Sequence, residues 1–312
     1  MIISSELEED FRWWYNTLIN PNQSNCILSG RFACEIFSDA SLTGWGASSS
    51  LDRTHGWWSY EDKALHINVL ELKAAFYALK CFASDRHDCE ILLRIDNTTA
   101  IAYINRFGSI KYPSLSIFSK AIWQWCEVRN IWLFASYIAS AENVIADEES
   151  RRLDSDTEWS LSSEAFQLID FVFGPFDLDL FASNINAKCD RFVSWIPDPE
   201  SFVIDAFTLD WGEFYFYAFP PFILLPRVLR KIINDEAVGI VIVPWWPSQS
   251  WFPLFKRLLT SSPIILDPAD DLLSSPFRKR HPAAKSLSLG VGRLSGKLLK
   301  PEVSQNPPLT PS

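Results

Sequence analysis

The stretch Phe32–Ala47, FACEIFSDASLTGWGA, decides the fold of this chain. Phe32, Cys34, Ile36 and Phe37 give it a short apolar run that predicts a buried strand. The run ends in Ser38-Asp39-Ala40, and Gly44 and Gly46 then supply a turn into a second strand. Most Asp residues at such a position only form turns, but the end of a buried strand also suits a metal-binding carboxylate.

The segments after this stretch alternate between strand and helix patterns. Their order predicts an α/β domain with a mixed five-stranded sheet and flanking helices. Beyond the first two strands, the expected elements are a strand at 55–60, a helix at 66–82, a strand at 90–95, helices at 97–104 and 115–129, a strand at 131–138 and a short helix at 144–152.

Four acidic residues stand at the ends or on the inner faces of these elements. Asp39 and Asp96 each end a strand, Glu71 lies on the alanine-rich side of the first helix, and Asp147 lies in the last helix. Each has an ordinary alternative: a turn residue, a solvated charge or a helix cap. The two glutamates that follow Asp147 compete with it for any acidic role, and spacing alone does not choose among the three.

Four sequence blocks resemble, in this order, the blocks of a retroelement ribonuclease H: SDASLTGWGA, HINVLELKAA, IDNTTAIAYIN and ENVIADEESR. The resemblance is greatest to DIRS-type retrotransposons, which encode a tyrosine recombinase, and it implies a ribonuclease H-like domain over residues 32–155. Residues 1–31 resemble the connection that follows a reverse transcriptase. An upstream reverse transcriptase portion of a polyprotein is therefore an implied partner.

The resemblance maps the four acids of that family onto Asp39, Glu71, Asp96 and Asp147, as catalytic residues and metal ligands. It implies two Mg²⁺ ions, with Mn²⁺ as an alternative, and endonucleolytic cleavage of the RNA strand of an RNA–DNA hybrid. One departure concerns residues 137–140, which read Tyr-Ile-Ala-Ser where the family often has His-Ile-Pro-Gly. We expect this difference to bear on turnover and not on metal binding.

The second half of the chain predicts another α/β domain, over residues 161–274, with a largely parallel sheet. FDLDLFAS, DAFTLDW and AFPPF resemble segments of phage-type adenine-N6 DNA methyltransferases. That family has Asn or Asp where this chain has Phe219, so we expect a methyltransferase-like fold without activity. Residues 275–312 are rich in basic residues, Pro, Ser and Gly, and are expected to form a flexible basic tail.

Composition limits the classes of function. The 312 residues carry a net charge of −10, which disfavours binding of nucleic acid by bulk charge alone. No secretory signal and no membrane-length apolar run are visible, and the six cysteines form no zinc-like spacing. We therefore expect an intracellular protein of the cytoplasm or nucleus, with no membrane partner; the oligomeric state stays open.

Three alternatives to a hybrid-cutting nuclease remain. The first is a non-catalytic remnant of a retrotransposon polyprotein that binds nucleic acid or another protein. The second is an adenine-N6 DNA methyltransferase, which Phe219 disfavours. The third is an integrase on the same fold, which a helix-borne Glu71 between two strand-borne Asp residues fits less well.

Overall fold

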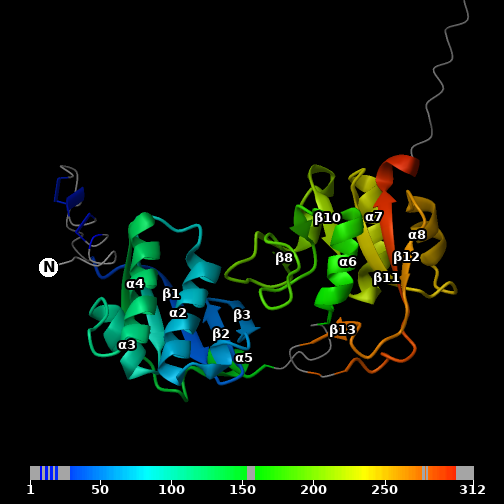
Figure 1. Ribbon diagram of the computed structural model, residues 1–312. Coiled ribbons are helices and arrows are strands. Elements are labelled where there is room, and N and C mark those ends of the chain that lie inside the picture. The colour runs from blue at the N-terminus through cyan, green and yellow to red at the C-terminus, as the bar shows by residue number, and fades with distance from the viewer. Residues whose placement is uncertain are drawn as a thin grey trace, which may run out of the picture.

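The computed structural model describes residues 8, 11–12, 15–16, 18–19, 29–152, 159–275, 278 and 280–299. These residues form two α/β units, one after the other in the sequence (Figure 1). The expected connection at 1–31 and the expected boundary near 155–161 fall largely or partly outside the described residues.

The first unit contains the mixed five-stranded sheet that the sequence predicts, in the order β3-β2-β1-β4-β5. The first three strands form an antiparallel meander, and β4 and β5 run parallel to β1. The strands are β1 (Phe32–Ala40), β2 (Gly44–Ser49), β3 (Asp52–Trp57), β4 (Cys89–Ile95) and β5 (Ile131–Tyr137).

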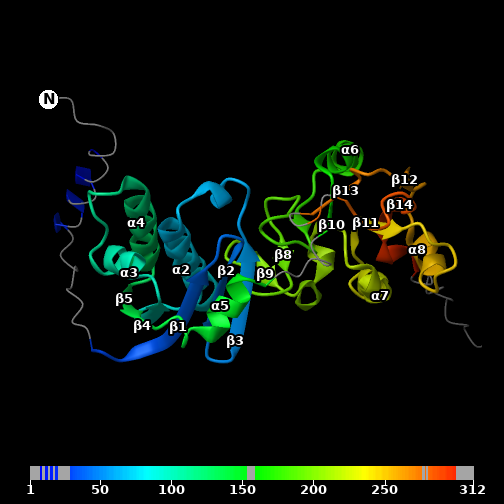
Figure 2. The same cartoon turned by 90° about the horizontal axis from the view of Figure 1, so that it is seen from below.

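Helices cover this sheet, one of them on a different face from the others (Figure 2). Trp45 and Ala47 of β2 belong to the core that α2, α3 and α4 close, whereas Gly46 between them faces the backbone of α5. Successive residues of a strand point to opposite faces, so α5 lies on the face opposite to α2. The helices are α2 (Ile67–Ala83), α3 (Thr98–Asn105), α4 (Pro113–Val128) and α5 (Val144–Ser150), with a 3-10 turn η1 at Asp62–Ala64.

The second unit also contains a five-stranded sheet, in the order β12-β14-β11-β10-β7. β7, β10 and β11 are mutually parallel, and β14 runs antiparallel to both β11 and β12. Four of the five strands therefore share one direction, which confirms a second α/β domain with a largely parallel sheet. The strands are β7 (Leu178–Asp179), β10 (Tyr215–Ala218), β11 (Val238–Pro244), β12 (Ile264–Leu266) and β14 (Leu289–Ser295).

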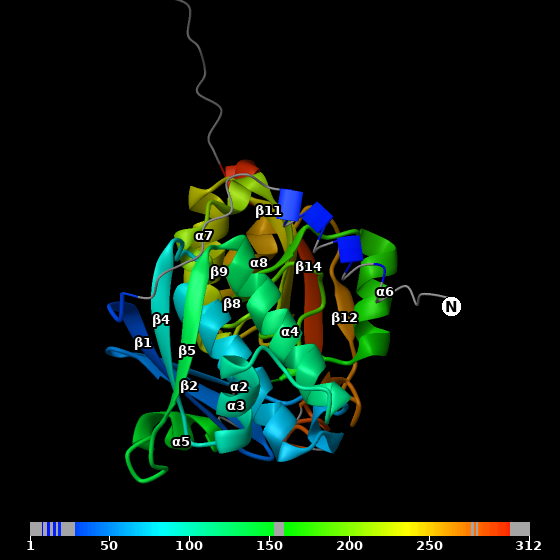
Figure 3. The ribbon, with the colours of Figure 1, turned by 90° about the vertical axis from the view of Figure 1, so that its left-hand side faces the viewer.

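Helices cover both faces of this second sheet (Figure 3). Ile240 and Ile242 of β11 pack in a cluster with Ile169 of α6, and the alternate residues Val241 and Val243 pack with α7 and α8. The helices are α6 (Ser163–Phe173), α7 (Leu225–Asn234) and α8 (Phe252–Leu258). The smaller elements are β6 (Ser160–Leu161) paired with β13 (Leu273–Ser274), β8 (Val193–Ser194) paired with β9 (Val203–Ile204), and the 3-10 turns η2 (Ala206–Thr208), η3 (Trp211–Glu213), η4 (Phe222–Leu224) and η5 (Gly296–Leu299).

The expectation of a flexible tail over residues 275–312 was wrong for residues 289–299. β14 lies inside the sheet between β11 and β12, and Leu289, Val291 and Leu294 are buried. The glycines at 290 and 292 lie directly under the rings of Trp245 and Phe255, where a larger residue would not fit. These glycines, which suggested flexibility, instead allow close packing.

The two units touch through side chains of both. Lys80 of α2 forms an ion pair with Glu200, and the hydroxyl of Thr54 donates a hydrogen bond to the carbonyl of Pro197. Within the part of the chain that the structure describes, no helix combines the length and apolar character needed to cross a bilayer.

Candidate metal centre

Two parallel neighbouring strands and one helix bring three carboxylates together. β1 and β4 are paired in parallel, so their carboxyl ends share one edge of the sheet. Asp39 is the second-last residue of β1, and Asp96 directly follows the last residue of β4. Glu71 comes from α2, whose buried alanines at 74, 75 and 78 let this helix lie close to the sheet.

The carboxylate groups of Asp39, Glu71 and Asp96 form a compact cluster. One oxygen from each can be chosen so that all three atoms lie within 4.8 Å of one another. Asp39 and Glu71 are each only 4% exposed, whereas Asp96 is partly exposed. The cluster is therefore buried on the side of the core and accessible on the side of Asp96.

Hydrogen bonds fix two of the three carboxylates and leave one oxygen of the third without a partner. Ser150 Oγ donates to Asp39 Oδ2 at 2.6 Å, and Ser140 Oγ donates to Asp96 Oδ2 at 2.6 Å. The backbone N–H of Ala40 donates to Glu71. The other oxygen of that group, Glu71 Oε2, is buried and has no hydrogen-bond partner among the described residues.

The electrostatics of the cluster favour a bound cation. Burial, followed by the charges of Asp39 and Asp96, raises the pKa of Glu71 to about 9. Burial also raises the pKa of Asp39, and the hydrogen bond from Ser150 only partly offsets this effect. Ionising several neighbouring buried carboxyl groups costs free energy, and a bound proton or metal ion offsets this cost. Mg²⁺ and Ca²⁺ are metal ions that prefer carboxylate oxygens. The residues present therefore fit a hard divalent cation.

Asp147 lies close to this cluster but outside the group of three. Its Oδ1 accepts hydrogen bonds from Arg151 Nε at 2.9 Å and Nη2 at 2.6 Å, and its side chain is 38% exposed. Its charge still raises the pKa of Asp39, so the two carboxylates are electrostatic neighbours.

The structure distinguishes the three consecutive acids of α5. Glu149 is buried on the side of β3, where its Oε2 lies 2.7 Å from His55 Nδ1 and its Oε1 lies 3.4 Å from Arg53 Nε. Glu148 is exposed. Of the three, Asp147 is the one whose charge acts on Asp39.

Ser140 and Ser150 were not identified from the sequence. Ser150 follows Asp147 by three residues, one helical turn, and this spacing could have placed both on the side of Asp39. Ser140 stands in the loop after β5, and only the folded arrangement reveals its contact with Asp96.

A hollow of about 630 Å³ lies between the two units, apart from the carboxylate cluster. It is lined by the loop after β7, by residues 219–224 and by side chains of the first unit that include Trp57. The ring of Phe219 packs edge-on against Phe222, with 6.1 Å between centroids. Next to this loop, Asp179 is buried and accepts hydrogen bonds from the backbone N–H groups of Phe181 and Lys188, and burial raises its pKa to about 6.

The second unit is similar to a known family. A family model described as DNA N-6-adenine-methyltransferase (Dam) matches residues 148–258. The match begins in α5 and ends with α8, so it includes Asp179 and Phe219 and leaves out β12 and β14. No curated protein matches the chain significantly.

The solved structures that resemble this chain include several ribonucleases H. RNase H1 from Halobacterium salinarum has 19% identity and a TM-score of 0.31, with 37% of this chain and 92% of that chain covered. LC11-RNase H1 in complex with an RNA/DNA hybrid has 21% identity and a TM-score of 0.32, over 37% and 92% of the two chains. A foamy viral protease-reverse transcriptase in complex with an RNA/DNA hybrid has 12% identity and a TM-score of 0.28, over 48% of this chain and 29% of that one.

Proposed function

We propose that the first unit is a metal-dependent endonuclease that cuts the RNA strand of RNA–DNA hybrids. The observation that carries this proposal is the convergence of Asp39, Glu71 and Asp96, with a buried oxygen of Glu71 that lacks a partner among the described residues. The four sequence blocks that resemble a retroelement ribonuclease H contribute these same residues, and they supply the substrate class.

In this proposal the three carboxylates hold divalent cations, with Mg²⁺ as the ion that the oxygen ligands favour. Such ions lower the pKa of a bound water and stabilise charge on a phosphodiester. Asp96 is the most exposed of the three, so an RNA strand would reach the cluster from the side of Asp96. Asp147, which forms an exposed ion pair with Arg151, is the fourth carboxylate that would serve as a ligand in this proposal.

The test compares the purified chain with Asp96→Asn on a labelled RNA–DNA hybrid, with Mg²⁺ or with EDTA. The neutral amide keeps the shape of the side chain and removes one ligand charge, so we expect cleavage to fall by a factor of about 100 or more. Glu148→Gln is the matched control, because it removes an exposed charge from α5 outside the cluster. Full cleavage by Asp96→Asn at equal folded content would place the nuclease activity elsewhere.

A metal-binding readout separates an inactive protein from a metal-free one. We expect Mg²⁺ to raise the unfolding temperature of the unaltered chain and of Glu148→Gln, and to raise it less in Asp96→Asn. A chain that binds the hybrid and Mg²⁺ but cuts nothing would support the non-catalytic remnant instead. The proposed context is a retrotransposon polyprotein, in which a reverse transcriptase portion supplies the hybrid.

The match to the Dam family favours a second candidate function, transfer of a methyl group to adenine by the second unit. The hollow of about 630 Å³ is large enough for a cofactor such as S-adenosylmethionine. Phe219 does not fit the transfer step, because the resembling enzymes hold the adenine amine with a polar side chain at this position. We infer that the unit keeps the fold and does not transfer methyl groups.

Two measurements address this second candidate. The first is methyl transfer from labelled S-adenosylmethionine to duplex and single-stranded DNA, beside a heat-inactivated control. The second is direct titration of the cofactor. Transfer that is lost in Asp179→Asn would overturn our inference, and cofactor binding without transfer would agree with it.

A further inference from the structure

The outward surfaces of α7 and α8 carry basic residues and no acidic ones. Both helices lie on the same face of the second sheet, where each contacts β14 and η5 (Figure 2). Neither helix contains Asp or Glu, although the whole chain has a net charge of −10. The exposed residues are Pro226, Arg227, Arg230 and Asn234 on α7, and Pro253, Lys256 and Arg257 on α8.

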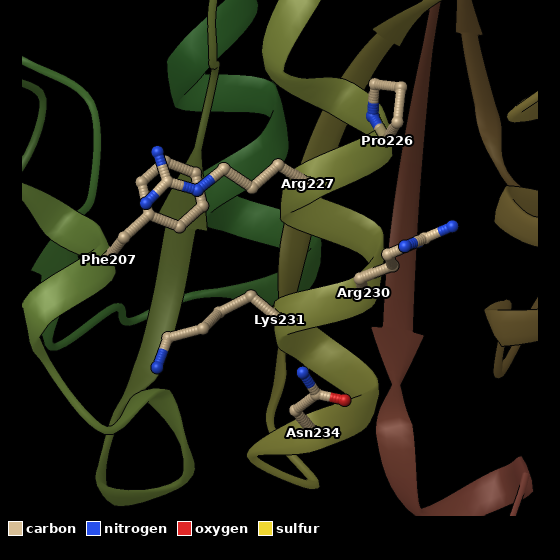
Figure 4. A pocket seen from close by; sticks show the side chains of 6 residues that line it. All are labelled: Phe207, Pro226, Arg227, Arg230, Lys231 and Asn234. Carbon is tan, nitrogen blue, oxygen red and sulfur yellow. The ribbon is translucent and has the colours of Figure 1, made fainter.

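A hollow of about 460 Å³ beside α7 is lined by part of this surface and by Phe207 (Figure 4). The guanidinium of Arg227 lies over the ring of Phe207, 3.6 Å from the ring centroid, while Arg230 extends from another side of the helix. Stacking on a ring fixes the plane of a guanidinium and leaves its N–H edges available for a second partner. Arg227 is therefore oriented before any ligand binds.

Some cations on this surface have an acidic partner in the described part of the chain and others do not. Lys231 Nζ lies 2.7 Å from Asp235 Oδ2, so this cation already has a counter-ion. Arg230 and Arg257 form no ion pair or hydrogen bond with any residue that the structure describes. Arginine is the residue that binds phosphate with two parallel N–H donors, so these groups suit a phosphate-bearing ligand.

We propose that Arg227, Arg230, Lys256 and Arg257, here called the basic face, bind the sugar-phosphate backbone of a nucleic-acid duplex. Cations spread over two adjacent helices match a ligand with repeated anionic groups better than a single small anion. Neither helix exposes a large apolar side chain that would insert into a bilayer, which favours nucleic acid over a membrane surface. This binding lies in the second unit and requires no metal, so it goes beyond the proposed nuclease.

The test measures binding of the full-length chain to a fluorescent RNA–DNA hybrid in EDTA, so that cleavage does not interfere, over a range of salt concentrations. We expect Arg227→Ala/Arg230→Ala to weaken binding about tenfold at low salt. The slope of log affinity against log salt should fall by about 2, since each lost phosphate contact lowers it by about 0.9. Arg230→Ala/Arg257→Ala should behave alike, and neither of its residues has a folded-state partner in the described chain whose loss would disturb the fold.

The matched control is Arg86→Ala/Lys285→Ala, which removes two exposed cations that lie outside α7 and α8. It changes net charge equally, and we expect it to keep both affinity and salt slope. The proposal is overturned if both basic-face variants bind like the unaltered chain, or if the control loses as much as they do. It is also overturned if the unaltered chain binds phosphatidylserine vesicles and not the hybrid.

Discussion

Glu71 links the candidate metal centre to the stability of the fold. Its pKa is raised to about 9 in the folded chain, against 4.5 for an unperturbed group. Between these values the folded state holds a proton that the unfolded state has released, so the free energy of unfolding falls as pH rises. The contribution of Glu71 is fully present below the lower value and is lost as pH approaches the higher one.

We therefore expect the metal-free chain to lose stability between pH 5 and pH 8, by roughly a few kcal/mol at most. Thermal unfolding in EDTA over this range measures the loss, and Glu71→Gln should reduce the pH dependence because its amide does not titrate, while Asp179, whose pKa is raised to about 6, still contributes near pH 6. Mg²⁺ should raise the unfolding temperature more at pH 8 than at pH 6, because the metal competes with the proton. An equal pH slope in Glu71→Gln would show that another group is responsible.

The sequence could place Asp39, Glu71 and Asp96 because each stands at a recognisable position, the end of a strand or the small-residue face of a helix. It could not separate Asp147 from its neighbours. That distinction depends on which side of α5 faces β3, where His55 and Arg53 contact Glu149. For Phe219, the identity of the residue alone supported the argument against methyl transfer, without any three-dimensional information.

At the scale of elements, the position of α5 depends on Gly46 of β2. A Cβ atom added at Gly46 would overlap with backbone atoms of Ala146 and Ser150, which cannot move aside as a side chain would. We expect Gly46→Ala to lower the free energy of unfolding by about 3 kcal/mol or more. It should also weaken the Mg²⁺-dependent rise in unfolding temperature, because displacement of α5 separates Ser150 from Asp39.

Gly30→Ala is the comparison for this experiment. A Cβ atom there meets no atom within 4 Å, although the φ of +71° still disfavours alanine. The expected cost is about 1–2 kcal/mol, without any effect on the response to Mg²⁺. Similar losses from both substitutions would mean that α5 does not pack against Gly46 as described.

β14 is the element whose removal should separate the two units. A chain that ends at residue 286 lacks the strand that pairs with both β11 and β12, so the second sheet loses its continuity. We expect this chain to keep the unfolding transition of the first unit and to lose that of the second, as measured by calorimetry and hydrogen exchange. A chain that ends at residue 299 should keep both transitions, and a second transition in the shorter chain would contradict the role given to β14.

Strands with continuous apolar runs and helices with a clear stripe were predictable in both units. β14 was not, because LGVGRLS has two glycines and follows a polar segment, a combination typical of a linker. The reason for these glycines lies in distant residues, Trp245 and Phe255, which occupy the space above them. The sequence around these glycines does not predict that packing.

At the scale of the whole molecule, the contact between Lys80 and Glu200 tests how the two units are arranged. The side chains are 21% and 49% exposed, so a coupling free energy of about 0.2–1 kcal/mol is expected. It is measured with a double-mutant cycle of Lys80→Ala, Glu200→Ala and the pair, followed by denaturant unfolding. A coupling of zero at low salt would mean that the units do not associate through these residues in solution.

The place of β14 also affects how the protein is made. β14 follows β11 and β12 in the chain but pairs between them. Both neighbours therefore leave the ribosome with one strand edge unpaired, and that edge stays unpaired until β14 has been synthesised. The first unit is complete by residue 150 and can fold during translation, whereas the second must stay incomplete until residue 295 has emerged. Open strand edges attract other chains, so the yield of intact protein should depend on translation speed, growth temperature and chaperone supply.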